Sequence, residues 1–231
     1  MRLLVAIAAV AALVAIAAMA NAARSTNGAV TAVAPPAPRV WDWPQAAPTE
    51  TPMRRAHAPL LSGFVVPVGG IEVPTEEQYL PNSARAYRSG YHEGIDFPVR
   101  NGTPVLAAKA GTIARIDADF RDWTPAEEQA AFDAAVALGY TPSVTLDRIR
   151  GRQVWIDHGG GVVTRYAHLS AVAPLRVGDT VTQGEVIGAV GSSGYPEGGP
   201  HLHFEIRVDD DFYGDGLPLT ELRYALSVAF R

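Results

Sequence analysis

The sequence predicts a mainly β domain in which short strands form a sandwich or barrel-like pair of sheets, with one inserted helix. Two observations predict this class. Short apolar segments recur between residues 63 and 208, and Gly or Pro punctuates them at regular intervals. One Ala-rich stretch with helix signals at both ends interrupts this pattern. We expect strands at residues 63–68, 103–107, 111–116, 153–157, 162–169, 180–181, 186–190 and 201–208.

The first 22 residues are typical of a targeting segment. Arg2 precedes an apolar run, and the small residues from Ala18 to Ala22 offer an Ala-x-Ala cleavage pattern, so we expect a signal peptide at residues 1–22. The run is also about long enough to span a bilayer, so an uncleaved N-terminal anchor is the alternative and would be the chain's one contact with a membrane. Either way, we expect the rest of the chain outside the cytoplasm, as a secreted, periplasmic, or cell-wall- or membrane-associated protein.

A change of composition separates this segment from a folded domain. Residues 23–59 are rich in Pro, Ala, Thr and Ser, a composition that cannot pack a core and favours an extended linker. We therefore expect the globular domain at residues 60–231, a length that suffices for one well-buried core.

The inserted helix is predicted at residues 125–138. Thr124 offers an N-cap, Pro125 suits the first helical position and Glu127 supplies an acidic third residue. Gly139 is a typical helix stop. The helix lies within an insertion at about 117–150 that separates two expected strands.

Composition excludes several classes of site. The formal charge is −5 and no basic block is present, so the chain lacks the electrostatic pattern of a nucleic-acid-binding protein. Cysteine is absent, which excludes disulfides, thiolate ligands and a cysteine nucleophile. Any metal site must therefore use His, Asp and Glu.

Three of the six histidines fall into two compact patterns, His92-Glu93-Gly94-Ile95-Asp96 and His201-Leu202-His203. Side chains alternate between the two faces of a strand, so His201 and His203 point the same way, and Glu205 shares their face and can orient a histidine. If residues 92–96 are extended, His92 and Asp96 also share a face.

Two imidazoles and one carboxylate leave an open position on a metal ion, which is typical of catalytic zinc sites. The same ligand set forms the facial triad of non-haem iron oxygenases, which is a second enzyme hypothesis. His168, in Tyr166-Ala167-His168-Leu169, can exchange protons near neutral pH. Isolated His-x-His patterns also arise by chance, so these residues alone leave a metal site undecided.

The residues around these histidines resemble the signature of the lysostaphin-like, or LytM-type, zinc metalloendopeptidases. The resemblance covers roughly residues 85–207 and is carried by an ordered series of motifs: Tyr87-Arg88-Ser89-Gly90-Tyr91, His92 to Phe97, Gly102-Thr103-Pro104-Val105, Ala110-Gly111-Thr112-Ile113, Ile156-Asp157-His158-Gly159, Thr164 to Leu169, Val177-Gly178-Asp179, Gln183-Gly184, Ile187-Gly188, Gly191-Ser192-Ser193-Gly194 and His201-Leu202-His203-Phe204-Glu205.

This resemblance implies a function and a set of site residues. It implies that His92, Asp96 and His203 bind one Zn²⁺ ion, and that His168 and His201 are the catalytic pair. It also implies a small antiparallel domain of the duplicated hybrid motif type, with the stem peptides or crossbridges of bacterial peptidoglycan as substrate. The departure is the segment at about 117–150, which is longer than the family pattern suggests and bears on the shape of the groove.

Two non-enzymatic hypotheses remain beside this one. A catalytically silent wall-associated domain would act as a binding module or as an activator of other wall hydrolases. A biotinyl- or lipoyl-like carrier would use Lys109, which lies between two expected strands.

Overall fold

A computed structural model of the protein describes residues 59–231. The signal peptide expected at 1–22 and the linker expected at 23–59 lie outside these residues, apart from Pro59. No helix in the described part of the chain is both long enough and apolar enough to cross a membrane.

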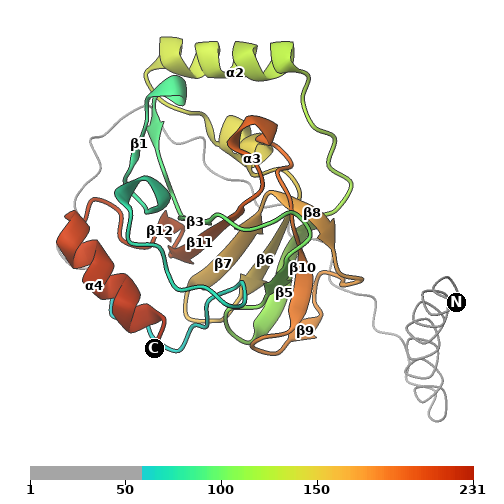
Figure 1. Cartoon of the computed structure of the whole chain (residues 1–231), viewed down its shortest axis with the longest axis vertical. Helices are drawn as coiled ribbons and strands as arrows, with labels where there is room; N and C mark the ends of the chain where they lie inside the picture. The colour runs from blue at the N-terminus through green and yellow to red at the C-terminus, as the bar shows by residue number, and fades with distance from the viewer. Residues whose placement is uncertain (1–58) are drawn as a thin grey trace, which may run out of the picture. The chain divides into compact units, whose positions relative to one another are not determined.

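The described residues form a mainly β fold, as the sequence predicts (Figure 1). The largest sheet has the strand order β12-β11-β7-β6-β5-β9, and β3 also pairs with β11. All of its pairs are antiparallel. Its strands are β3 (Ile95–Phe97), β5 (Gly111–Asp117), β6 (Gln153–Asp157), β7 (Val162–Ala167), β9 (Thr180–Val181), β11 (Leu202–Val208) and β12 (Asp211–Phe212).

Two smaller antiparallel sheets complete the β structure. One has the order β4-β10-β8, formed by Pro104–Leu106, Val186–Val190 and Leu169–Val172, and the other pairs β1 (Ala84–Arg85) with β2 (Gly90–Tyr91). Short 3₁₀ helices lie at η1 (Glu77–Tyr79), η2 (Ala86–Arg88) and η3 (Pro196–Gly198). Buried side chains from the two larger sheets form one core, in which Tyr166, Leu169, Ile187 and Phe204 are fully buried.

The apolar face of β11 forms part of this core. Leu202 and Phe204 are fully buried and Ile206 is 4% exposed, as the alternation of residues 201–208 predicts. The opposite face is polar but equally buried, with Glu205 at 0% exposure. A polar face inside the protein needs internal partners, and it is this face that carries the histidines.

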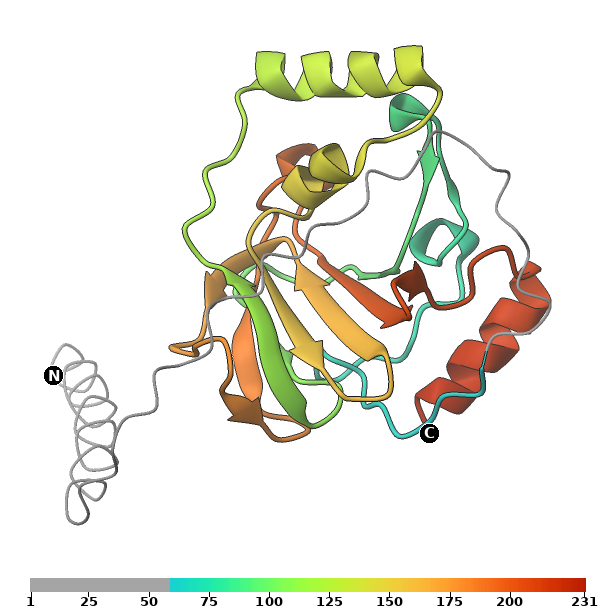
Figure 2. The ribbon, with the colours of Figure 1, turned by 180° about the vertical axis from the view of Figure 1, so that it is seen from behind.

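The predicted helix is confirmed as α2 (Pro125–Leu138), with the same bounds. The Thr124 side chain accepts a hydrogen bond from the Glu127 amide, and the Glu127 carboxylate accepts one from the Thr124 amide. Gly139 ends the helix in the left-handed conformation, with φ at 76°. In Figures 1 and 2, α2 lies at one end of the domain, beyond the sheets.

Two further helices were not predicted. Helix α3 (Ser143–Arg150) follows α2 within the inserted segment and lies nearer the sheets, and α4 (Leu219–Ala229) packs near the C-terminus (Figures 1 and 2). The caps explain why both were missed. Each helix follows a proline, Pro142 or Pro218, and neither has a side-chain cap.

Two strand predictions need correction. The expected strand at 162–169 is two strands, because His168 adopts a left-handed φ of 60° between β7 and β8. The expected strand at 63–68 is reduced to an isolated bridge between Val68 and Val105. The segment 92–96, whose extended conformation the sequence leaves open, is a strand only at its end, because His92 precedes β3.

Candidate metal centre and active site

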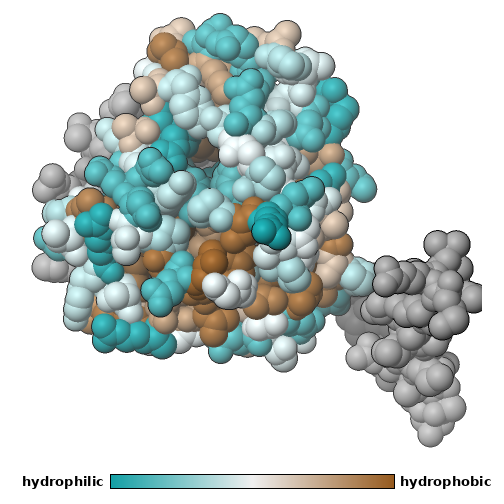
Figure 3. All heavy atoms as spheres, viewed as in Figure 1, coloured by the Kyte–Doolittle hydropathy of each residue, from teal (hydrophilic) through white to brown (hydrophobic). Residues whose placement is uncertain are grey.

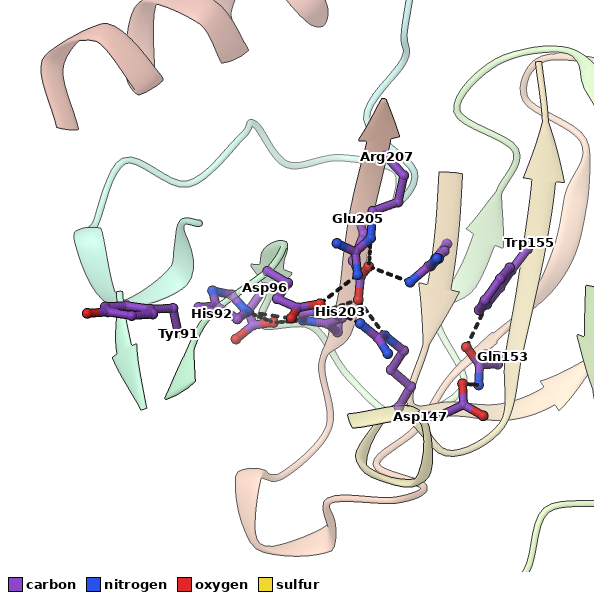
Figure 4. A network of polar contacts seen from close by, with 12 residues as sticks. Tyr91, His92, Asp96, Asp147, Gln153, Trp155, His203, Glu205 and Arg207 are labelled. Carbon is purple, nitrogen blue, oxygen red and sulfur yellow. Dashed lines mark hydrogen bonds and ion pairs between the residues drawn. The ribbon is translucent and has the colours of Figure 1, made fainter. Parts of the chain in front are cut away.

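The register between β3 and β11 brings two of the predicted ligands together. Asp96 and His203 are directly opposed across this antiparallel pair, so their side chains leave the same face. Oδ1 of Asp96 lies 2.9 Å from Nδ1 of His203. The same oxygen lies 2.9 Å from Nε2 of His92, which precedes β3. Figure 4 shows the three side chains next to one another.

These three side chains can hold a metal ion. One donor atom from each of His92, Asp96 and His203 lies within 4.8 Å of the other two donors. Two imidazole nitrogens and one carboxylate oxygen match the donor set of catalytic zinc sites, which keep a further position open. The chemistry of the residues therefore fits the zinc ion that the resemblance implies.

The ring of His92 is held by the main chain around it. Its Nδ1 lies 3.0 Å from the carbonyl oxygen of Leu80, which can only accept a hydrogen bond. This contact assigns the proton of neutral His92 to Nδ1 and leaves the Nε2 lone pair facing Asp96 and His203. The backbone amide of His92 also donates to the Ser83 carbonyl, at 2.8 Å. His92 is thus pre-oriented and only 3% exposed.

The ring of His203 is oriented by Glu205. Nε2 of His203 lies 3.0 Å from Oε1 of Glu205, so Nε2 donates and Nδ1 faces the other ligands. This confirms the expectation that Glu205 shares the face of His203 and contacts a histidine. Figure 4 shows Glu205 beside His203 on β11, with Arg207 further along the strand.

Charge interactions strongly shift the pKa values of His92, Asp96 and His203. Burial raises the pKa of Asp96, but His92 and His203 outweigh it and hold that pKa well below its usual range. Burial lowers the pKa of His92, and Asp96 opposes this effect only in part. For His203 burial also lowers the pKa, but hydrogen bonds to Asp96 and Glu205 outweigh it and raise the pKa overall. An ionised carboxylate thus lies between two imidazoles, an arrangement ready for a cation.

The two other predicted site residues lie beside this cluster. The ring centroids of His168 and His201 are 4.6 Å apart, and that of His168 lies 5.7 Å from that of His203. Nδ1 of His168 donates to the Ser193 carbonyl at 2.9 Å, and Nδ1 of His201 donates to the Gly199 carbonyl at 2.9 Å. In both rings Nε2 is therefore free for a substrate. Nε2 of His201 is 3.7 Å from Oδ1 of Asp96.

All five of these residues line one cavity of about 460 Å³, and Figure 3 shows the surface hollowed below α2. One wall is aromatic. The rings of Tyr87 and Tyr195 stack at 5.8 Å with an interplanar angle of 5°, and Phe132 of α2 meets Tyr87 edge-on. The inserted segment therefore supports a wall of the cavity, which agrees with the expectation that it affects groove shape.

Other polar residues from the sequence lie outside the cluster. His158 contacts the Ala110 carbonyl and the Thr164 hydroxyl, each at 2.8 Å, so it braces a turn. Lys109 donates to the Ser62 carbonyl at 3.1 Å. Glu93 lines the cavity, but Arg150 and Arg207 each contact its Oε2 at 2.6 Å, so it is poorly suited to be a base.

The chain is similar to several characterised peptidases. The relative named DD-carboxypeptidase/endopeptidase Mpg, from Neisseria meningitidis, is 36% identical over 142 residues, which cover 60% of this chain and 26% of that relative. The peptidoglycan DD-endopeptidase ShyC from Vibrio cholerae is 28% identical over 118 residues, or 51% of this chain and 20% of that relative. The chain thus spans about a quarter or less of the length of these two proteins.

Among solved structures, the catalytic domain of lysostaphin from Staphylococcus simulans is 30% identical, with a TM-score of 0.36 over 52% of this chain and 68% of that domain. The model of Peptidase family M23 matches residues 90–214, which is more than half of the chain and includes all five candidate site residues. The resemblance to lysostaphin-like and LytM-type peptidases is thereby confirmed, and the chain belongs to peptidase family M23.

Proposed function

We propose that this protein is a zinc-dependent endopeptidase that hydrolyses peptide bonds in bacterial peptidoglycan. One observation carries the proposal: His92, Asp96 and His203 present three donor atoms within 4.8 Å of one another in the wall of a cavity. Membership of peptidase family M23 supports hydrolysis of a peptide bond. The name of the Vibrio relative, a peptidoglycan DD-endopeptidase, supports peptidoglycan as the substrate class.

In this proposal His92, Asp96 and His203 hold one Zn²⁺ ion. When bound, zinc would polarise the scissile carbonyl and make water a nucleophile near neutral pH. The Leu80 carbonyl and the Glu205 carboxylate hold the rings of His92 and His203, so both imidazoles are oriented for metal binding.

In this proposal His168 and His201 transfer protons and stabilise the negative charge that develops on the substrate. Burial, with His201 and His203 nearby, holds the pKa of His168 well below its usual range, so His168 is neutral at pH 7. A neutral imidazole with a free Nε2 can take a proton from the attacking water. His201, with its Nε2 free and close to Asp96, is placed to donate a hydrogen bond to the oxyanion once protonated.

The substrate places the protein outside the cytoplasm. Stem peptides and crossbridges of peptidoglycan lie beyond the cell membrane, in agreement with the signal peptide or anchor expected at residues 1–22. We therefore propose a secreted, periplasmic or wall-associated enzyme with peptidoglycan as its partner.

Digestion of purified peptidoglycans of defined crosslink type, with mass spectrometry of the products, tests this function. We expect uncrosslinked peptides to be released, the release to stop with a chelator, and zinc to restore it better than iron. His203→Ala is the matched negative control. Fully zinc-loaded protein that releases no peptide from any wall type would contradict the proposal.

A further inference from the structure

Glu205 is a fully buried carboxylate on the polar face of β11, and three guanidinium groups surround it. Arg150 contacts it at 2.6 Å, Arg207 at 2.7 Å and Arg165 at 3.4 Å. A carboxylate that is fully buried in this way depends on its guanidinium partners, because an unpaired charge in the interior is costly.

The two oxygens of Glu205 have different partners. Oε1 accepts from Nε of Arg150 at 2.6 Å and lies 3.0 Å from Nε2 of His203. Oε2 accepts from Arg207 and Arg165. The oxygen that orients the metal-binding histidine is therefore the one that Arg150 holds.

Arg150 also contacts Glu93, the neighbour of His92, and the backbone of His168. Its Nη2 contacts Oε2 of Glu93 at 2.6 Å, and Glu93 is the neighbour of His92 in the chain. Its carbonyl oxygen accepts the backbone amide of His168 at 2.8 Å, at the point where the chain takes its left-handed turn. One buried residue at the end of α3 thus contacts groups beside both predicted histidine ligands and beside the predicted base.

We propose that Arg150, which the inserted segment supplies, is a positioning residue for the metal centre: it fixes the Glu205 oxygen that orients His203, and its carbonyl fixes the backbone of His168. This inference rests on the proposed function only in assuming that His92, Asp96 and His203 bind the metal. It gives the insertion a second role, because the segment that forms a cavity wall also completes the support of the ligands.

Arg207 provides a matched control inside the same network. It contacts the same two carboxylates, with Nε 2.7 Å from Oε2 of Glu205 and Nη2 2.6 Å from Oε2 of Glu93. It is 8% exposed and Arg150 is 6% exposed. The two arginine side chains differ in the Glu205 oxygen that they hold, so a comparison of side-chain variants separates the positioning of His203 from general charge balance.

The test measures metal binding directly in the full chain. Zinc affinity is determined by competition with a chromophoric chelator, and ligand geometry by the visible absorption spectrum of the Co²⁺-substituted protein. We expect Arg150→Gln to weaken zinc binding by about 10- to 100-fold and to alter the Co²⁺ spectrum. Arg207→Gln is expected to weaken zinc binding several-fold less and to keep the spectrum of the unmodified protein.

Arg150→Lys keeps the charge and protects the test against a failure of the Gln variant to fold. A lysine cannot hold Glu205 and Glu93 together as the planar guanidinium does, so we expect zinc affinity between those of Arg150→Gln and the unmodified protein. Equal losses in the Arg150→Gln and Arg207→Gln variants, or unmodified affinity and spectrum in both Arg150 variants, would overturn the inference.

The two proposals fail in distinguishable ways. Unmodified protein that binds zinc but cuts no peptidoglycan contradicts the proposed function, while the comparison of Arg150 with Arg207 still decides the positioning role. Unmodified protein that binds no zinc overturns both.

Discussion

A Cβ atom on Gly94 would lie 2.5 Å from the carbonyl oxygen of Phe204 and 2.9 Å from Cε1 of His203. The segment between His92 and Asp96 can therefore lie this close to β11 only because residue 94 is a glycine. Gly94 is required for this close approach, which also brings together the three predicted ligands.

Gly94→Ala is accordingly expected to push this segment away from β11. Overpacking of this kind costs about 1–3 kcal/mol, and we expect weaker zinc binding in addition. Urea unfolding and a zinc titration measure the two effects. Gly69→Ala is the control, because a Cβ there meets nothing within 4 Å. Equal behaviour of the two variants would show that the close approach is not needed.

His168→Gln separates catalysis from metal binding. If His168 is the base, the rate of peptide release should fall by about 10²- to 10⁴-fold while zinc affinity stays within a few-fold of the original. His158→Gln, which changes a histidine outside the cavity, should keep the rate. A silent wall-binding domain predicts instead that His168→Gln changes nothing measurable in wall binding or cell phenotype.

Tyr195 tests the aromatic wall. Tyr195→Ala removes the ring that stacks on Tyr87, and we expect KM for a wall peptide to rise by about two- to tenfold, since aromatic pairs contribute roughly 0.5–1.5 kcal/mol. Tyr195→Phe keeps the ring and should keep most of the affinity. Tyr224→Ala, on the exposed side of α4, is the control. A rise in KM as large for Tyr195→Phe as for Tyr195→Ala would assign the effect to the hydroxyl group.

Glu128 on α2 predicts a pH dependence of stability. Burial, with Glu197 and Asp122 nearby, raises the pKa of Glu128, and its Oε1 is buried without a hydrogen-bond partner among the described residues. The folded state then binds this proton more tightly than the unfolded chain does. The free energy of unfolding therefore decreases as the pH rises from the unfolded pKa through the raised folded one.

Glu128→Gln should remove this effect. The variant is expected to be more stable than the unmodified protein at pH 7, and the gain should vanish below about pH 4, where both states are protonated. Thermal unfolding across this pH range measures it, with Glu72→Gln as an exposed control. A gain that persists at low pH would mean that the side-chain amide, not the lost charge, stabilises the variant.

Much of the fold could be predicted because its signals are local. The cap at Thr124, the proline after it and Gly139 predict both ends of α2 correctly. Alternation along 201–208 predicts which face of β11 carries Glu205. Helix α3 has no side-chain cap, so its N-terminus lacks the signal that marks the start of α2. Predictions succeeded where neighbouring residues determine the conformation.

The features that could not be predicted depend on contacts between segments that are distant in sequence. The break at His168 is held by the carbonyls of Arg150 and Ser193, neither of which is near it in sequence. Arg207 could have been noticed, because it follows Glu205 on the same face of β11. Arg150 could not, because only the docking of α3 on the sheet brings it to Glu205.

Residues 118–152 leave the sheet and return to it at the same position, because Asp117 of β5 is paired with Gln153 of β6. An excursion that starts and finishes at one place can lengthen, shorten or be exchanged in evolution without shifting any other strand. Related proteins could thus acquire new substrate preferences by exchanging the segment that corresponds to residues 118–152. Any replacement would have to supply a guanidinium group to Glu205, the carboxylate that contacts the predicted ligand His203.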